Sequence, residues 1–460
     1  MPAALNRSKW LAPLLAVQLL LAPLLAQAQL AGEVEFSRGV GFAQSPGQAP
    51  RTLGKGLQLQ EGDRLTTSEG ASAIIKMQDG TRMTVRPNSE LVVQQYQFTE
   101  NSPDNTMLIQ LVRGGFRAVT GLISKNSPNA ARIQTNTATI GIRGTDFDAR
   151  LCIRECGTES ARITENARPN AVQASAKMVT VTGEVNAIDG AGERRRLVEG
   201  GSVFPGDTIE TTRGSQAVLA FRDDTRVTLG SQTRFRLDNF VYDDRNAGEG
   251  RFLASILRGS VRALTGLIAK SNTRNVGFST ATATIGIRGT GFDVSCTGPC
   301  AGEPNLGLPG AGLTLWTWLG AIEVGRPGQT ALQVLQSGQG LFIPLSGNIV
   351  PIQNQPAMDT PRPDQVQVPP KLFSSNAVSD SAEGLFVFVR KGHIEIASAK
   401  DVIHIGPGEA GFSSPAGDMA RPLTVPKFID FDQVPLPTSK SPLLASVLGE
   451  SGIKSNNSCK

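Results

Sequence analysis

The most regular feature of the sequence is a short-range alternation of apolar and polar residues that breaks at Gly, Asp and Asn. One segment shows it clearly: Ala73, Ile75 and Met77 alternate with other residues, an Asp-Gly turn follows, and Met83 and Val85 resume the pattern. Alternation with a period of two is typical of strands with one buried face, and Asp-Gly is typical of a hairpin turn. The pattern therefore predicts a chain built of short strands and turns.

The same pattern recurs about 144 residues later in the chain. Four blocks match four others at this spacing: GDRLTT and GDTIETT, MQDGTRMTV and FRDDTRVTL, RGGFRAVTGLISK and RGSVRALTGLIAK, and TATIGIRGTDFD and TATIGIRGTGFD. Matches of this length are far beyond chance, so the sequence predicts two copies of one β-rich unit, at 29–175 and 176–345. Because Asp favours tight turns, we expect four acids of these blocks to build turns rather than to catalyse. These are Asp63, Asp79, Asp207 and Asp223.

A weaker repeat lies further along the chain. The segment 313–344 resembles 385–415, since both combine two strands with a Gly-containing turn and an I-E-[VI] sequence. We therefore expect a small separate β-module at 384–415, joined to the second unit by a Pro- and Gln-rich linker at 346–383. The tail 416–460 is expected to be largely irregular. The predicted fold class is all-β, with stacked short strands in a solenoid- or sandwich-like arrangement.

The first 28 residues have the pattern of a cleavable secretory leader. Arg7 and Lys9 give a basic start, the apolar stretch 10–25 follows, and Ala26 and Ala28 supply the small residues of a cleavage site. The apolar stretch is interrupted and short for a membrane span. We therefore expect a periplasmic protein, rather than an extracellular one, with no stable membrane insertion after cleavage.

The five cysteines divide into two matched pairs and one remaining residue. Cys152 and Cys156 form one C-x3-C pair, and Cys296 and Cys300 form the other at the corresponding place. In an oxidising compartment such pairs are expected to form disulfides. A zinc site built from all four thiolates is the alternative, although structural zinc sites favour closer spacing. Cys459 is left either as a free thiol or as an intermolecular partner.

Composition and charge narrow the classes of function. The 460 residues include 45 basic and 40 acidic side chains, an excess too small and too dispersed for nucleic-acid binding. The tight basic run Arg194 to Arg196 lies beside two glutamates and is expected in a solvated loop. Only two histidines occur, His393 and His404, both outside the duplicated blocks. We expect them to be satisfied or solvent-facing, and we expect no catalytic residue, metal or cofactor.

The duplicated blocks carry a resemblance to a known family. At GDRLTT, DGTRMTV, RGGFRAVTG and IGIRGTDFD the sequence resembles the FecR domain family, and both copies match its pattern over most of 31–344. The resemblance implies an all-β extracytoplasmic domain that acts in envelope signalling. In the family's namesakes this domain relays the occupancy of an outer-membrane transporter to a cytoplasmic sigma factor. The namesakes carry an anti-sigma segment and a transmembrane helix before the domain, whereas a leader is expected here, so direct control of a sigma factor is not implied.

The IGIRGT block supplies the first candidate interaction residues. The guanidinium groups of Arg143 and Arg288 suit a carboxylate or phosphate ligand. The structural alternative is that these arginines pair with Asp148 and Asp293 of their own blocks and lock a turn that the threonines cap. The candidates from this block are Arg143, Thr145, Arg288 and Thr290.

Two tryptophans are the other candidates. Trp316 and Trp318 lie two positions apart and would share one face of a strand. They could stack on a sugar ring or contact a protein, and the alternative is that at least one belongs to the core.

Two functions follow from the sequence. The first is a non-enzymatic component of protein interaction or signal transduction in the bacterial cell envelope, with a membrane sensor or outer-membrane protein as its partner. The alternative is a glycan- or peptidoglycan-associated binding protein of the envelope.

Overall fold

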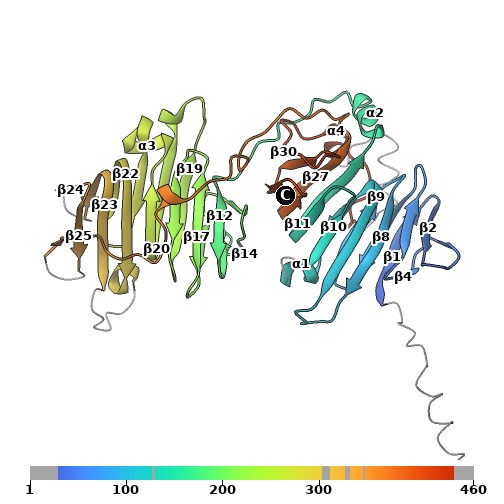
Figure 1. Cartoon of the computed structure of the whole chain (residues 1–460), viewed down its shortest axis with the longest axis horizontal. Coiled ribbons are helices and arrows are strands. Elements are labelled where there is room, and N and C mark those ends of the chain that lie inside the picture. The colour runs from blue at the N-terminus through green and yellow to red at the C-terminus, as the bar shows by residue number, and fades with distance from the viewer. Residues whose placement is uncertain (1–28, 127–129, 303–310, 327–331, 345–347, 440–460) are drawn as a thin grey trace, which may run out of the picture.

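The computed structural model describes residues 29–126, 130–302, 311–326, 332–344 and 348–439. The predicted leader and Cys459 lie outside these residues. The described chain forms two matching 15-stranded sheets, which lie side by side (Figure 1). We call the sheet of β1–β11 and β27–β30 unit 1, and the sheet of β12–β26 unit 2. The predicted all-β fold class is confirmed.

The strands of unit 1 are β1 (Leu30–Arg38), β2 (Gly41–Gln44), β3 (Arg51–Thr52), β4 (Gln58–Gln60), β5 (Arg64–Thr67), β6 (Ser72–Met77), β7 (Arg82–Val85), β8 (Glu90–Gln97), β9 (Thr106–Val119), β10 (Ala131–Gln134), β11 (Thr139–Cys152), β27 (Gly384–Ala397), β28 (Val402–Ile405), β29 (Ala410–Ser413) and β30 (Met419–Ala420). Those of unit 2 are β12 (Ala176–Thr182), β13 (Val185–Ile188), β14 (Arg194–Arg196), β15 (Ser202–Val203), β16 (Thr208–Thr211), β17 (Gln216–Phe221), β18 (Arg226–Leu229), β19 (Arg234–Val241), β20 (Arg251–Leu264), β21 (Val276–Ser279), β22 (Thr284–Thr297), β23 (Gly312–Gly325), β24 (Gln333–Gln336), β25 (Gln339–Ile343) and β26 (Val350–Ile352). The helices are short: α1 (Leu122–Asn126), α2 (Glu155–Ala161), α3 (Leu267–Ser271), α4 (Lys427–Asp430) and the 3-10 turns η1 (Ala247–Glu249), η2 (Thr273–Asn275), η3 (Gly298–Ala301) and η4 (Pro363–Gln365).

The last four strands of the chain belong to unit 1. Strand β27 pairs antiparallel with β11 along its whole length, as β23 pairs with β22 in unit 2. The segment 384–415, expected from the sequence to be a separate module, thus completes the sheet of unit 1. Unit 2 therefore lies, in chain order, between two parts of unit 1. The weak repeat revealed a strand unit but not its pairing partner, which lies more than 200 residues away.

Each unit has two layers joined by long bent strands. In unit 1 the first half of β9 pairs with β8 and β10, and its second half pairs with β7 and β11. We call the layer of β5, β8, β10 and β28 the open layer, and the layer of β1, β6, β7 and β29 the strapped layer. The same pairings recur in unit 2. Alternate residues of both layers point inward and form one buried apolar core in each unit.

Extended segments cross the outer side of each strapped layer. Over unit 2, the described residues 353–373 form strap 2, in which the carbonyl oxygen of Thr360 accepts a hydrogen bond from Arg262 at 2.7 Å. Over unit 1, residues 421–439 form strap 1, in which Asp432 pairs with the buried Arg86. The Pro- and Gln-rich segment is mostly irregular, as its composition predicts, but it is bound along unit 2 rather than free.

Candidate functional site

The IGIRGT block of unit 1 lies at the corner where β11 bends between the two layers. Gly144 has φ +64°, and Gly392 on β27 has φ +90°. A Cβ on Gly392 would lie 2.3 Å from the carbonyl oxygen of Gly144, so only glycine allows the two strands to pass this closely. The Thr145 amide donates to the Thr120 hydroxyl at 2.7 Å, and the Thr145 hydroxyl donates to the His393 carbonyl oxygen at 3.0 Å.

Unit 2 has the same corner. Gly289 and Gly320 take the places of the two corner glycines, with a Cβ on Gly320 again 2.3 Å from a carbonyl oxygen. The Thr290 amide donates to the Thr265 hydroxyl at 2.9 Å, and the Thr290 hydroxyl donates to the Ala321 carbonyl oxygen at 2.6 Å. Both threonines are buried. The Gly-Thr part of the motif therefore builds the fold.

The arginines of the two blocks project from the open layers. Arg143 pairs with Glu395 at 3.4 Å, and Arg288 pairs with Glu323. The Arg288 side chain is 61% exposed, whereas Arg143 is largely covered. Arg288 is thus the only candidate of the two arginines with a broadly accessible guanidinium group.

The aspartates of the blocks have partners other than those expected. Asp148 accepts from Arg390 at 2.9 Å, and Asp293 accepts from Arg262 at 3.0 Å. The expected pairing of each aspartate with the arginine of its own block is therefore wrong. The corner between them sends the arginine to the open layer and the aspartate to the strapped layer. Burial raises the pKa of Asp148, although Arg390 opposes this shift.

Asp79 forms the centre of a buried turn that ties three parts of unit 1 together. Its carboxylate accepts from the amide and hydroxyl of Thr81 at 3.1 and 2.8 Å, and from the amide of Ile123 at 3.3 Å. The Thr81 hydroxyl accepts from the amide of Gly121 at 2.8 Å. Asp223 repeats these contacts in unit 2. The prediction that these acids build turns is confirmed.

The other pair of acids also holds loops. Asp63 accepts from the Gln60 amide at 2.8 Å and pairs with Arg51 at 2.7 Å. Asp207 pairs in the same way with Arg195. The basic run 194–196 therefore forms the edge strand β14 and not the solvated loop that we expected, and its middle arginine is an internal partner of Asp207.

The two tryptophans share a face of β23, but that face is covered. Trp316 is 7% exposed. Trp318 donates from its indole nitrogen to Asp293 at 2.9 Å, and the guanidinium of Arg362, from strap 2, lies 4.2 Å above its ring. The pair therefore does not form an open platform for a sugar ring.

Both cysteine pairs form disulfides. Cys152 and Cys156 are joined at 2.03 Å, and Cys296 and Cys300 at 2.08 Å. All four sulfur atoms are therefore committed, and the two pairs belong to different units. These bonds contradict the alternative of a four-thiolate zinc site.

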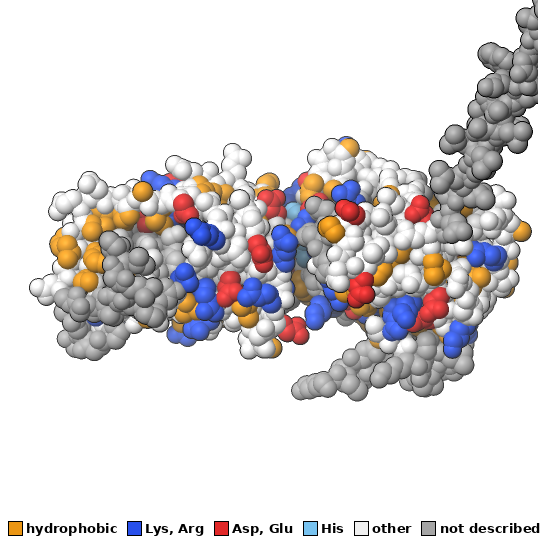
Figure 2. All heavy atoms as spheres, turned by 90° about the horizontal axis from the view of Figure 1, so that it is seen from below, with side chains coloured by type: hydrophobic (Ala, Val, Ile, Leu, Met, Phe, Trp, Pro, Cys, Tyr) orange, Lys and Arg blue, Asp and Glu red, His pale blue; other side chains and the backbone are white. Residues whose placement is uncertain are grey.

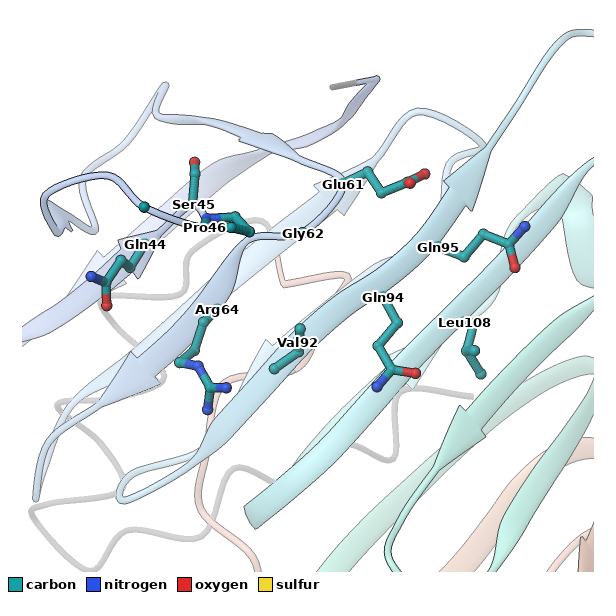
Figure 3. A pocket seen from close by; sticks show the side chains of 11 residues that line it. Gln44, Ser45, Pro46, Glu61, Gly62, Arg64, Val92, Gln94, Gln95 and Leu108 are labelled. Atoms are coloured by element: carbon teal, nitrogen blue, oxygen red, sulfur yellow. The ribbon is translucent and has the colours of Figure 1, made fainter. Parts of the chain in front are cut away.

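The open layer of unit 1 carries a groove that the sequence did not predict (Figure 3). Its volume is about 790 Å³, and β5, β8 and β9 form its floor. Arg64, Val92, Gln94 and Leu108 lie in a row across these strands, facing the turn at Ser45. The remaining lining residues are Gln44, Pro46, Gly47, Glu61, Gly62 and Gln95.

The groove offers polar groups of both kinds without a dominant charge. Gln94 donates to Gln110 at 2.8 Å, which fixes one amide while its carbonyl oxygen faces the groove's side of the layer. Arg64 is paired with Glu90, and Glu61 accepts from a backbone amide at 3.0 Å. Amide side chains donate and accept, so they suit the peptide groups of an extended chain better than an ionic or apolar ligand.

The same layer of unit 2 is hollowed differently. A cavity of about 450 Å³ lies over the paired residues Gly277 and Gly286, which leave the sheet surface without side chains. Leu253 and Leu332 give this hollow an apolar wall, and Glu323 lies at its rim. The two open layers therefore present different chemistry on the same strand framework.

Comparison with known families identifies the motifs. The profile of the family described as FecR protein matches residues 63–163 and 207–300. Each matched range contains one Asp-centred turn, one glycine corner and one disulfide. The chain carries two FecR domains. Both matches end before the last four strands of their unit, so β27–β30 and β23–β26 extend beyond the matched part of each FecR domain. The family match supports a role in signal transduction.

Solved structures and curated proteins add less. Two crystal structures of a proposed anti-sigma factor from Parabacteroides distasonis ATCC 8503, at 1.65 and 2.50 Å resolution, are each 17% identical to this chain with a TM-score of 0.24. Each alignment covers 32% of this chain and 59% of the other. No curated protein matches.

The two FecR domains meet at a buried cluster of charges. Lys177 on β12 pairs with Glu409 at 2.9 Å, and Arg421 pairs with the same carboxylate at 3.0 Å. All three side chains are at most 1% exposed. Burying two cations with one anion is costly unless every member has its partners, so this junction depends on the whole cluster. We call these three residues the junction cluster.

The two histidines lie beside the junction cluster, in the seam between the units (Figure 2). His393 and His404 contact each other with 3.3 Å between their ring nitrogens. Burial, together with Lys177, lowers the pKa of His404 to about 4, and burial and His404 lower that of His393 well below its usual value. Both rings are therefore neutral at neutral pH. The prediction of a satisfied histidine fits, but their place between two units was not predicted.

The electrostatics of the cluster follow from the same burial. Burial lowers the pKa of Lys177 to about 8, although Glu409 opposes this shift. Burial alone would raise the pKa of Glu409, but Lys177 and Arg421 outweigh it and lower the pKa. The sequence gave no sign of this cluster, because its members lie on segments that pair only in the folded chain.

Among the described residues, no helix is both long and apolar enough to cross a bilayer.

Proposed function

We propose that this chain is an exported, non-enzymatic FecR-domain protein that transmits signals in the bacterial cell envelope by binding a protein partner. The observation that carries the proposal is the groove on the open layer of unit 1. The polar residues of the family motifs are used up inside the fold, whereas the groove presents amides, Arg64 and Glu61 on an uncovered sheet face. Two disulfides and the predicted leader support export into an oxidising compartment.

The partner we propose is an extended segment of a membrane sensor or outer-membrane protein. An extended peptide offers repeated N–H and C=O groups, which match the donors and acceptors of the groove. Glycan binding was the alternative, but it rested on Trp316 and Trp318, which strap 2 covers. We therefore keep glycan binding only as an outcome of the test.

The test places a photo-crosslinking amino acid at Gln94 of the groove in living cells. The matched control is the same substitution at Asp238, which occupies the corresponding position in unit 2. We expect a discrete protein adduct from Gln94 and none of the same mass from Asp238. Val92→Arg, which fills the groove from an exposed position, should abolish the adduct while the protein stays folded.

Retention on insoluble peptidoglycan distinguishes the alternative. Binding to peptidoglycan that Val92→Arg abolishes, without a protein adduct at Gln94, would replace the proposed partner with a glycan. An adduct that persists in Val92→Arg would show that the groove is not the binding site.

A further inference from the structure

The junction between the units is made by two surfaces, and the internal repeat supplies each of them twice. Strands β12 and β15 of unit 2 form one surface, and β28 with the start of β29 in unit 1 forms the other. Their counterparts are β1 and β4 of unit 1 and β24 and β25 of unit 2, which lie at opposite ends of the molecule (Figure 1). We call these the N-end and the C-end.

Close packing at the junction involves two pairs of residues besides the junction cluster. The ring of His404 lies against Gly200, where a Cβ would be 2.0 Å from the ring. Ser202 lies against Gly406, where a Cβ would be 2.4 Å from the hydroxyl oxygen. Both contacts depend on a glycine that leaves room for the partner.

The counterparts of these residues are uncovered. Gly56 corresponds to Gly200, since both donate their amide to the carbonyl of the equivalent residue of the first strand, and no described atom lies within 4 Å of a Cβ there. Val334 takes the place of His404, because the two pair with equivalent glutamates, and it is 44% exposed.

Apolar side chains are exposed at both ends. Those of the C-end are Leu319, Leu332, Val334 and Val350, and those of the N-end and its neighbouring strand are Leu30, Val40 and Phe42. Figure 2 shows the apolar side chains gathered at the outer end of unit 2. Proteins built of stacked units normally close their ends with polar surfaces, because open ends associate. Here the two open ends are counterparts of surfaces that already bind each other within the chain.

We propose that the C-end of one copy binds the N-end of another, so that copies associate head to tail. The contact is heterologous and does not close on itself, so it produces linear chains of copies. Glu33 replaces Lys177 and Gln339 replaces Glu409 at this contact, so an amide-to-carboxylate hydrogen bond takes the place of the buried ion pair. Binding between copies is therefore weaker than the junction and reversible.

Sedimentation velocity and light scattering over a concentration series test the proposal. The weight-average mass should rise more than twofold with concentration and show no plateau at a dimer. Two variants block one end each: Val334→Arg at the C-end and Gln58→Arg at the N-end, both at exposed positions. Each alone should be monomeric, with an unchanged thermal transition.

Mixing the two blocked variants gives the decisive result. Each retains one intact end, so an equimolar mixture should form a dimer and nothing larger. A second measurement uses Gln58→Cys in one copy and Gln336→Cys in another, at the counterparts of Ser202 and Gly406, in a Cys459→Ser background. Oxidation of the mixture should give one heterodimer. A monomer at every concentration, or a closed dimer that the mixture fails to restore, would overturn the proposal.

Discussion

Unit 1 and unit 2 contain the same fifteen strands with the same pairings, but only unit 2 is continuous in the chain. Unit 2 runs from β12 to β26 without interruption, whereas unit 1 receives its last four strands after unit 2 is complete. The difference shows that the FecR domains are not two beads on a string. The C-terminal part of the chain both completes the first domain and provides the surface that binds the second.

The two units also differ at the surface that follows their last strands. In unit 1 this surface holds the junction cluster and two histidines, whereas unit 2 has neutral or apolar residues at the same places. Glu409 corresponds to Gln339, and His404 to Val334. The fold was thus copied while the contact surface diverged, so matched substitutions in the two units separate structural effects from effects on the junction.

Removing the C-terminal strands should have the largest effect. A chain that ends after Val378 keeps strap 2 but lacks β27–β30, which contribute eight residues to the core of unit 1. Burial of each such side chain contributes about 1.5–3 kcal/mol, so the loss exceeds the whole stability of a typical domain. We expect unit 1 to lose its amide protection in hydrogen-exchange mass spectrometry while unit 2 keeps it. Persistent protection in β9 and β11 would contradict the discontinuous domain.

Breaking the junction cluster should come next. Glu409→Ala leaves Lys177 and Arg421 buried without their anion, which typically costs about 3–5 kcal/mol. The matched control is Gln339→Ala, whose side chain is exposed and should change stability by less than about 0.5 kcal/mol. Urea unfolding followed by tryptophan and far-UV signals measures both. Equal effects of the two substitutions would show that the cluster does not hold the units together.

Acid should open the junction with a somewhat smaller effect. Burial lowers the pKa of His404 from 6.5 to about 4, so the opened state binds more protons between these values. The stabilisation is complete above pH 6.5 and is lost as the pH falls towards 4, by about 3 kcal/mol in total. Protonated His404 would face Lys177, Arg143 and Arg421, whose charges oppose it, with Glu409 as the only nearby acid.

Small-angle scattering at decreasing pH detects this opening as an increase in the radius of gyration. His404→Val copies the residue found in unit 2 and should shift the opening to lower pH. An unchanged midpoint in this variant would assign the acid response to other groups.

Much of the fold could be predicted from local sequence, because the signals are local. The Asp-Gly turns and alternating strands indicated the β-units, and the C-x3-C spacing indicated the disulfides. The partner of β27 could not be predicted, because a pairing across more than 200 residues leaves no local pattern. The arginine pairs were wrong for a related reason: a glycine corner separates Arg143 from Asp148 and directs them to different layers.

The candidate site was also beyond prediction. The groove is made of ordinary residues such as Gln94 and Val92, which become a site only where β5, β8 and β9 meet the turn at Ser45. The tryptophans stood out in the sequence because they are rare, but strap 2 covers them. Rare residues mark the core as often as the surface, so composition alone could not find the binding face.

The discontinuity of unit 1 has a consequence in time. Strand β11 ends at Cys152, and its partner β27 begins at Gly384. At a synthesis rate of about 5–20 residues per second, the ribosome needs roughly 10 to 50 s to supply that partner. During this interval unit 2 can fold completely, while Ile140, Ile142 and Phe147 wait on an unpaired edge. The domain that is made first is therefore finished last, and it is the part of this protein most in need of a chaperone.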